Sequence, residues 1–196
     1  NLCEYLVGAV KPFLVSARAK DIDIQMAEIQ EALNSTDDSD DIIVNIDPVK
    51  MNVVVRNLIT NAIKYGDAGP ITVAADREAA EARIRVSDTG IGIGEADQAR
   101  IFERFERAVA DPGTAPTGFG VGLWLVRRLA EAMGGGVAVH SRPGEGATFA
   151  VRIPGARVVA PVLALLLTLL AALGPGLAAS QELGPLGPLG KDGRIT

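Results

Sequence analysis

The sequence contains very few of the side chains that build crosslinks and most metal centres. Of its 196 residues, one is a cysteine, Cys3, and one is a histidine, His140. A single cysteine excludes a disulfide framework and a cysteine metal site within the chain. A single histidine excludes zinc sites that need two histidines. Cysteine crosslinks and paired-histidine metal sites therefore do not explain what this chain does.

The sequence also lacks any block of basic residues. It has 24 acidic and 19 basic side chains, which give a formal net charge of -5. Proteins that bind nucleic acids usually carry a concentrated positive surface that contacts the phosphates. We therefore expect no nucleic-acid partner, whereas a small ligand that carries phosphate groups is still compatible with this charge.

The chain is long enough for one domain of ordinary size and a further segment. Alternation of apolar and polar residues predicts strands at 21–29, 42–46, 70–76, 82–88, 137–141 and 147–153. Helical spacing predicts helices at 2–19, with a bend near Pro12, at 48–65, in short pieces over 95–108, and at 123–133. Helices interleaved with antiparallel hairpins are typical of an α+β layer sandwich.

The composition changes sharply near the C-terminus. From Val158 to Gln181 the sequence has no charged residue, and about 20 apolar residues are enough to cross a bilayer. Residues 157–181 have three interpretations: a membrane span, a secretory signal peptide joined on by a run-on of two reading frames, and a buried core helix. We divide the chain into a domain at 1–156, this apolar segment, and a Gly/Pro-rich tail at 182–196 that we expect to be disordered.

One predicted helix carries an unexpected polar face. Asn57, Asn61, Lys64 and Tyr65 recur at helical spacing, so they project from one side of the helix. Asparagine is a poor helix former, because its amide competes for backbone hydrogen bonds. An amide oxygen can ligate Mg²⁺ that arrives with substrate phosphates, and a lysine can neutralise phosphate charge. The alternative is a polar face that only contacts water.

The stretch "SDTGIGIG" places a carboxylate at the end of a predicted strand, followed by alternate glycines. Gly90 and Gly92 allow the backbone to approach a flat ligand closely, while Asp88 accepts hydrogen bonds from an amine such as that of adenine. On its own, this pattern usually marks a turn.

A second glycine stretch, "TGFGVGLWLV", leads into a predicted helix. Gly118, Gly120 and Gly122 leave backbone N–H groups free at a helix start, where they favour phosphate. The stretch is not a P-loop, because the Gly-Lys-Ser/Thr ending is absent, and its glycine spacing differs from a Rossmann fingerprint.

Taken in order, "NLITNAIKYG", "DTGIGI", "FERF", "GFGVGLWLV" and "GEGATFAV" resemble the ATP-binding catalytic domain of bacterial sensor histidine kinases, within the GHKL ATPase superfamily. The resemblance covers residues 4–153, and several motifs in the right order are more specific than any one of them. It implies a two-layer α/β sandwich of the GHKL (Bergerat) type, with a mixed, mainly antiparallel sheet and helices on one face. It also implies ATP and Mg²⁺ as ligands.

The resemblance implies a role for each matching residue. Asn61 resembles the amide that ligates Mg²⁺, with Asn57 in the same cluster, and Arg107 resembles a γ-phosphate contact. Lys64 resembles a phosphate-contacting cation, and Tyr65 a side chain that packs by the adenine. The other matches are Asp88 as the adenine-reading carboxylate, Gly90 and Gly92 beside it, Phe102 and Phe105 of the F box, Gly118, Gly120 and Gly122 of the ATP lid, and Thr148 near the adenine ring. Phe119 departs from the small or polar residue common at its position in the lid.

A histidine kinase of this family needs parts that this sequence does not contain. The family transfers the γ-phosphoryl group of ATP to a histidine on a dimerisation helix pair, and His140 lies instead on a predicted strand of the ATP-binding fold. Because the sequence begins at Asn1, we expect a fragment whose dimerisation domain lies upstream or acts in trans, with a response regulator as the next partner. ATP supply implies that residues 1–156 are cytoplasmic, and they are membrane-anchored if residues 158–181 span a bilayer.

Two other functions stay open from the sequence. One is another GHKL protein, either an anti-sigma-factor serine kinase or an ATPase of the mismatch-repair or heat-shock chaperone type. The F box, and a lid that runs directly into "GLWLV", favour the histidine kinase. The other is a non-catalytic module in which bound ATP holds a conformation for a partner. Asn61, Asp88 and the lid glycines argue against a degenerate site of that kind.

Overall fold

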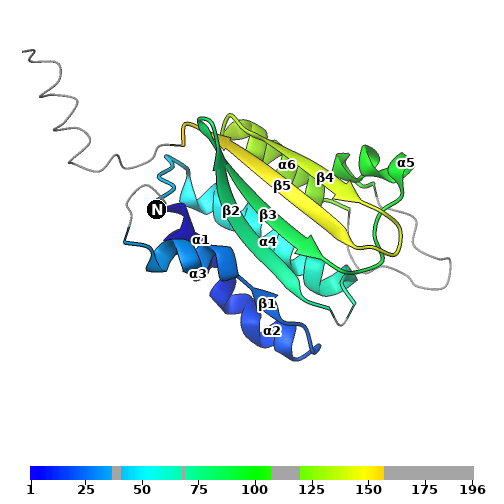
Figure 1. Ribbon diagram of the computed structural model, residues 1–196. Helices are drawn as coiled ribbons and strands as arrows, with labels where there is room; N and C mark the ends of the chain where they lie inside the picture. Colours follow the sequence, from blue (N-terminus) through cyan, green and yellow to red (C-terminus); the bar gives the residue numbers. More distant parts are fainter. Residues whose placement is uncertain (37–40, 68, 107–119, 157–196) are drawn as a thin grey trace, which may run out of the picture. The chain divides into compact units, whose positions relative to one another are not determined.

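A five-stranded sheet forms the frame of the domain (Figure 1). The computed structural model describes residues 1–36, 41–67, 69–106 and 120–156. The strands are β1 (Ile24–Gln25), β2 (Ile71–Glu78), β3 (Glu81–Asp88), β4 (Gly136–Ser141) and β5 (Ala147–Pro154). Their order across the sheet is β1-β2-β3-β5-β4, with β1 parallel to β2 and the other neighbours antiparallel. The predicted α+β fold with a mainly antiparallel sheet is confirmed.

The longer helices cover one face of this sheet. The helices are α1 (Leu2–Val10), α2 (Leu14–Arg18), α3 (Ala27–Asn34), α4 (Pro48–Tyr65), α5 (Glu95–Gln98) and α6 (Gly122–Ala132), with 3₁₀ turns at Lys11–Phe13 and Arg100–Phe102. In Figure 1, α4 lies behind β2 and β3, and α6 lies behind β4 and β5. The predicted helix at 2–19 is interrupted at Pro12, where the 3₁₀ turn at Lys11–Phe13 separates α1 from α2.

Alternation along the strands places the core on the face that the helices cover. In β3, Ala82, Ile84 and Val86 are buried, and the residues between them are half-buried on the outer face. Helix α4 packs its apolar side against this face through Met51, Val54, Val55, Leu58, Ile59, Ala62 and Ile63. Burial of one such side chain contributes about 1.5–3 kcal/mol, so this layer holds α4 in a fixed position.

The start of α4 follows the predicted capping pattern. The Asp47 side chain accepts hydrogen bonds from the backbone N–H of Val49 at 2.9 Å and of Lys50 at 3.2 Å. Pro48 occupies the first helical position, where a missing N–H does no harm. The Lys50 side chain contacts the same carboxylate at 2.8 Å and helps to lower the pKa of Asp47. The helix start is therefore fixed locally, seventeen positions before Lys64.

Two strand predictions are wrong. The predicted strand at 21–29 forms only β1, and the chain then enters α3. The Ala, Glu, Gln and Leu residues of α3 are good helix formers, and burial of Ile29 on one side of α3 is compatible with helical spacing. The predicted strand at 42–46 shows only a single bridged residue, Ile43. Ile42 is nevertheless buried and its carbonyl accepts the Leu2 N–H at 2.8 Å, so this segment packs as an irregular connection.

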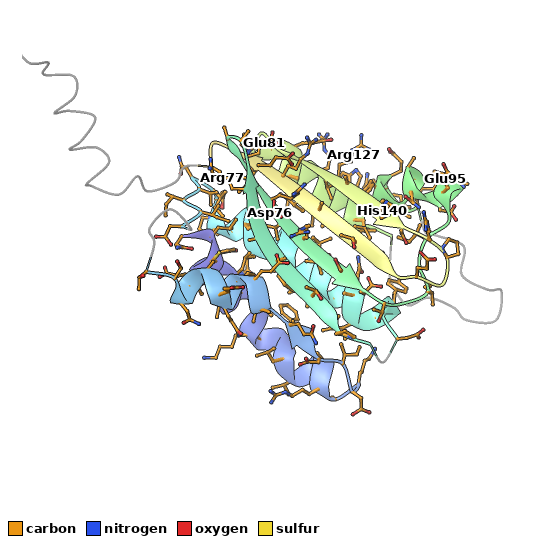
Figure 2. The ribbon with its side chains drawn as sticks, viewed as in Figure 1. Asp76, Arg77, Glu81, Glu95, Arg127 and His140 are labelled. Carbon is orange, nitrogen blue, oxygen red and sulfur yellow. The ribbon has the colours of Figure 1, made fainter. Side chains whose placement is uncertain are left out.

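The outer face of β2 and β3 is charged. Arg83 contacts Asp76 at 2.9 Å, and Arg85 contacts Asp76 at 3.0 Å and Glu28 of α3 at 3.2 Å. Figure 2 shows Asp76 among the polar side chains of this face. A sheet face with partly exposed ion pairs is suited to water rather than to a second core. The functional elements are therefore expected on the helix side of the sheet.

The core ends with β5. Ala156 is buried, and its N–H donates to the Ala80 carbonyl at 2.9 Å. The apolar segment 157–181 and the tail 182–196 lie outside the described residues, so their interpretations are untested. Within the ranges that the structure describes, no helix is long and apolar enough to cross a membrane.

We propose that the folded domain ends at residue 156, and a truncation tests this boundary. A chain of residues 1–156 is expected to unfold cooperatively in urea, with a free energy within ~0.5 kcal/mol of the full chain. A matched truncation after Val151 removes Ile153, which is 1% exposed, and should cost at least ~2 kcal/mol. Aggregation or non-cooperative unfolding of residues 1–156 would show that the apolar segment belongs to the core.

Candidate functional site

The polar side of α4 is open, whereas its apolar side is buried. Asn57, Asn61 and Lys64 are half-buried and Tyr65 is exposed. The Asn57 side-chain amide donates to the Val53 carbonyl at 2.7 Å, one turn earlier in the helix. This bond uses the amide nitrogen and leaves the side-chain oxygen for other contacts. The predicted cluster therefore forms one continuous polar strip along the helix.

The start of α6 lies directly against this strip. A Cβ atom on Gly122 would lie 2.9 Å from the Asn57 side-chain oxygen, so a larger residue would displace the Asn57 side chain. Gly122 is the first residue of α6, and the first turn of a helix presents free N–H groups and a partial positive charge. The structure thus brings Asn57 and Gly122 together at a place suited to phosphate.

Lys64 and Tyr65 form a pair at the end of α4. The Lys64 ammonium donates to the Tyr65 hydroxyl at 2.9 Å and lies 4.6 Å from the centre of its ring. A cation held over an aromatic ring keeps its charge close to the helix end. The structure therefore places a positive charge and an aromatic side chain next to each other, as their spacing predicts.

Asp88 occupies the last position of β3, on the helix-covered face. Its carboxylate accepts the Gly90 N–H at 2.9 Å. Burial raises the pKa of Asp88, and hydrogen bonds from the backbone of Gly90 and Ala147 partly offset this rise. A carboxylate with limited access to water is a stronger partner for a ligand amine than an exposed one.

The loop after Asp88 passes very close to the end of α4. A Cβ atom on Gly90 would lie 1.9 Å from the Tyr65 carbonyl oxygen and 2.7 Å from the Gly66 Cα. The Ile91 N–H donates to the same carbonyl at 3.3 Å. Because only glycine allows this approach, the carboxylate of Asp88 is held beside the end of the polar strip.

Replacement of Gly90 by alanine is expected to destabilise the domain by about 1–3 kcal/mol, the usual cost of forcing atoms into a packed site. Urea unfolding without nucleotide measures this effect. Gly94→Ala is the matched control in the same loop, because a Cβ there would meet only the Asp97 carboxylate at 4.0 Å. Equal effects of the two substitutions would contradict the close approach at Gly90.

Phe102 and Phe105 have different environments. Phe102 is buried and meets Phe149 edge to face, with ring centres 6.3 Å apart, so it is a core residue. Phe105 is 62% exposed, has φ 67°, and its N–H donates to the Gly120 carbonyl at 2.9 Å. This bond joins the two chain ends that flank residues 107–119. Arg107, Gly118 and Phe119 lie outside the described residues.

Contacts that the sequence motifs do not reveal connect the F box to α6. The Arg104 guanidinium lies 4.7 Å from the centre of the Phe105 ring and 5.6 Å from that of Trp124. Arg127, labelled in Figure 2, contacts Glu103 at 3.0 Å. These residues were not predicted as part of the site, because charged and aromatic residues at such spacing occur on many helices. They connect residues 103–105 to α6.

Thr148 does not join the site. It lies on the outer face of β5, where its hydroxyl donates to the Ser87 hydroxyl at 2.9 Å. Ala147 is the residue paired with Asp88 and faces the helices. Successive residues of a strand point to opposite faces, so the position beside Asp88 belongs to Ala147. If Phe149 is taken as a core residue, alternation along the strand places Ala147, and not Thr148, on the same face.

Gly92 lies farther along the same loop, and the single histidine lies on the other face of the sheet. Gly92 has φ 69°, and its backbone passes beside the Arg142 carbonyl of the β4–β5 turn. His140 is exposed and paired with Thr148, and Figure 2 shows its place on β4. The prediction that His140 lies on a strand is confirmed.

The side chains at the candidate site fit a metal ion that is already bound to the phosphates of a substrate. In the part of the chain that the structure describes, no group of three or more His, Cys, Asp or Glu side chains could hold a metal ion. The half-buried Asn61 offers one neutral oxygen, and Mg²⁺ bound to substrate phosphates needs few protein ligands because it keeps several waters. The residues present therefore fit a phosphate-borne Mg²⁺ and not a dedicated metal cage.

Comparison with known proteins decides the family. Residues 46–157 match the model of a family described as histidine kinase-, DNA gyrase B- and HSP90-like ATPase, which is more than half of the chain. The chain belongs to this ATPase family. The match includes α4, the Asp88 loop and α6, so the elements that converge at the candidate site are those of the ATPase family.

Two relatives at the sequence level are a sensor protein and a histidine-protein kinase. The chain is 41% identical over 150 residues to the virulence sensor protein BvgS of Bordetella bronchiseptica, covering 74% of this chain and 11% of that protein. It is 34% identical over 126 residues to the signal transduction histidine-protein kinase BarA of Escherichia coli K12, covering 62% of this chain and 14% of BarA. The chain thus spans only about a tenth of the length of these relatives.

Solved structures show the same architecture. Full-length ShkA in complex with AMPPNP matches with a TM-score of 0.67 and 28% identity, over 82% of this chain and 31% of that chain. The catalytic domain of the histidine kinase ThkA matches with a TM-score of 0.63 and 25% identity, over 79% of this chain and 93% of that chain. The ATPase fold of the present chain is therefore comparable in extent to one complete catalytic domain.

Proposed function

We propose that this chain is the ATP-binding catalytic portion of a two-component sensor histidine kinase. The observation that carries the proposal is that the polar strip of α4 meets the start of α6 at Asn57 and the loop after Asp88 at Tyr65. The similarity to the virulence sensor protein BvgS, to the histidine-protein kinase BarA and to the AMPPNP complex of ShkA supports it. In this proposal the chain donates the γ-phosphoryl group of ATP to a histidine outside the present sequence.

Each part of the site has a distinct task in this proposal. The Asp88 carboxylate accepts hydrogen bonds from the adenine amine, and Tyr65 packs by the ring. Asn61, with Asn57 beside it, ligates Mg²⁺, which neutralises phosphate charge when bound. The Lys64 ammonium and the first N–H groups of α6 bind phosphate oxygens. Phosphoryl transfer needs such positioning and electrostatic stabilisation more than covalent chemistry from the protein.

The acceptor histidine has to come from elsewhere. His140 is exposed on the outer face of β4, whereas Asp88 faces the helices. The sheet therefore separates this imidazole from the nucleotide. A dimerisation domain, upstream or in trans, supplies the acceptor nitrogen, ADP leaves, and a response regulator takes the phosphoryl group next. The domain works in the cytoplasm, where ATP is present, and residues 158–181 anchor it if they cross a membrane.

Transfer from γ-labelled ATP tests this function. When the 196-residue chain is mixed with a histidine-bearing dimerisation domain supplied as a separate protein, we expect acid-labile, base-stable label on that domain and none on the chain itself. His140→Ala should label the partner to the same extent as the unmutated chain. Acid-stable label on serine or threonine would favour the anti-sigma-factor kinase instead. ATP binding without any transfer would favour the non-catalytic module, and phosphate release without an acceptor would favour another GHKL ATPase.

A further inference from the structure

A buried hydroxyl connects the loop after Asp88 to the β4–β5 hairpin. Among the residues that the structure describes, Ser141 is the single buried side chain that is polar or charged, with 8% exposure. Burying a hydroxyl is costly unless its hydrogen bonds are satisfied. Ser141 ends β4, and no predicted motif contains it. Its burial next to the site requires an explanation beyond packing.

Ser141 joins two chain segments through one oxygen. Its hydroxyl accepts the Ile93 N–H at 2.8 Å and donates to the Gly146 carbonyl at 2.5 Å. Ile93 belongs to the loop that follows Asp88, and Gly146 immediately precedes Ala147, the partner of Asp88 across the sheet. Both segments that border the carboxylate are therefore tied to the same hydroxyl.

Gln98 completes the connection from α5. Its side-chain amide donates to the Ile93 carbonyl at 3.0 Å and to the Ser141 carbonyl at 2.8 Å. The Ile93 peptide is thus held on both sides, by Ser141 at its N–H and by Gln98 at its carbonyl. A loop fixed in this way has little freedom to rotate.

The Gly146 backbone, which accepts the Ser141 hydrogen bond, also packs on the backbone of Asp88. A Cβ atom on Gly146 would lie 2.0 Å from the Asp88 carbonyl oxygen, so the Gly146 backbone packs directly on that residue. The Gly144 N–H also donates to the Ile91 carbonyl at 2.8 Å. Movement of the hairpin turn would therefore move the Asp88 peptide and the amides of Gly90 and Ala147 that hold its carboxylate.

We propose that Ser141 and Gln98 are positioning residues that orient the Asp88 carboxylate and thereby determine the preference of the site for a purine with a 6-amino group. This inference rests on the proposed nucleotide site. Neither side chain needs to touch the nucleotide, because both act through the Ile93 peptide and the Gly146 carbonyl. Loss of either tie is expected to reduce recognition of the amine more than binding of the phosphates.

The test compares two nucleotides on the full 196-residue chain. ATP and purine riboside 5′-triphosphate differ only in the 6-amino group. The dissociation constant of purine riboside triphosphate divided by that of ATP therefore isolates the contact with this group. One hydrogen bond to a charged group corresponds to about tenfold or more in this ratio. Ser141→Ala and Gln98→Glu are expected to lower the ratio at least ~threefold. Gln98→Glu keeps the shape of the side chain but removes its N–H donors. If Ser141→Ala does not fold, the ratio measured for Gln98→Glu tests the proposal alone.

Glu95→Gln is the matched control, because Glu95 is exposed on the same short helix as Gln98 (Figure 2). It removes one negative charge from this helix, whereas Gln98→Glu adds one. This variant should keep the unmutated ratio. If the two test variants weaken both nucleotides by the same factor, the tie is only structural and the inference is wrong. An unmutated chain that binds ATP and purine riboside triphosphate equally well overturns the inference together with the role of Asp88. An unmutated chain that binds neither ATP nor purine riboside triphosphate overturns the proposed function as well.

Discussion

Replacement of Asn61 by aspartate is expected to abolish the Mg²⁺-dependent part of ATP affinity while the domain stays folded. Asn61 is half-buried on α4, whereas Leu58 and Ile59 are buried in the core. The substitution replaces a neutral amide with a carboxylate, which repels the triphosphate and alters the neutral coordination of the metal. Changes among the outer partners of a metal cost about 10–100-fold in metal affinity, so the loss of a direct ligand should cost at least as much.

The matched control for this substitution is Asn52→Asp. Asn52 is exposed on the same helix, nine residues before Asn61 and therefore on its opposite side. It introduces the same charge at a distance from the site. ATP titrations with and without Mg²⁺ measure both variants, and circular dichroism checks their fold. Unchanged Mg²⁺-dependent affinity in Asn61→Asp would remove Asn61 from the site.

Replacement of Asp88 by asparagine is expected to weaken the preference for ATP over GTP. The amide keeps an acceptor for the Gly90 N–H but loses the charge that favours the adenine amine. Competition between ATP and GTP, measured on the chain and on the variant, gives the size of the effect. Equal binding of ATP and GTP by the unmutated chain would count against the role of Asp88.

The same substitution is expected to change how stability depends on pH. Because burial raises the pKa of Asp88 in the folded state, the folded chain holds more protons than the unfolded chain between the two pKa values. Its free energy of unfolding without nucleotide therefore falls as the pH rises through this interval. Asp88→Asn should remove this fall. ATP affinity should show the opposite trend and weaken as the pH falls, because the ionised carboxylate binds the amine.

The sequence predicts the regular parts of the fold because their signals are local. The cap at Asp47, the start at Pro48 and the alternation in β2 to β5 depend on neighbours in the chain. The predictions for segments 21–29 and 42–46 are wrong beyond Ile24–Gln25, because the chain enters α3 after β1, and Ile42 packs in the core and accepts the Leu2 N–H instead of extending a strand. Their conformation is decided by tertiary packing, which single-sequence patterns do not contain.

The sequence indicates which residues belong to the candidate site, but it does not indicate which contacts bring them together. The asparagines of α4 and the half-buried Asp88 depart from local preferences, and such departures concentrate at functional sites. The approach of Gly90 to Tyr65 joins elements far apart in the sequence, so it required the structure. Ser141 ends a strand without any motif. The resemblance assigned Thr148 to a position near the adenine ring, whereas the structure pairs Ala147 with Asp88.

Calorimetric titration of the chain with ATP, with and without Mg²⁺, tests the central claim most directly. The account predicts saturable binding at one site per chain, strengthened by Mg²⁺. It also predicts that Asn61→Asp loses this strengthening and that Asn52→Asp retains it. Absence of saturable binding, or binding of equal strength with and without Mg²⁺, would contradict the proposal that this ATPase fold holds a Mg²⁺–ATP site built on α4 and Asp88.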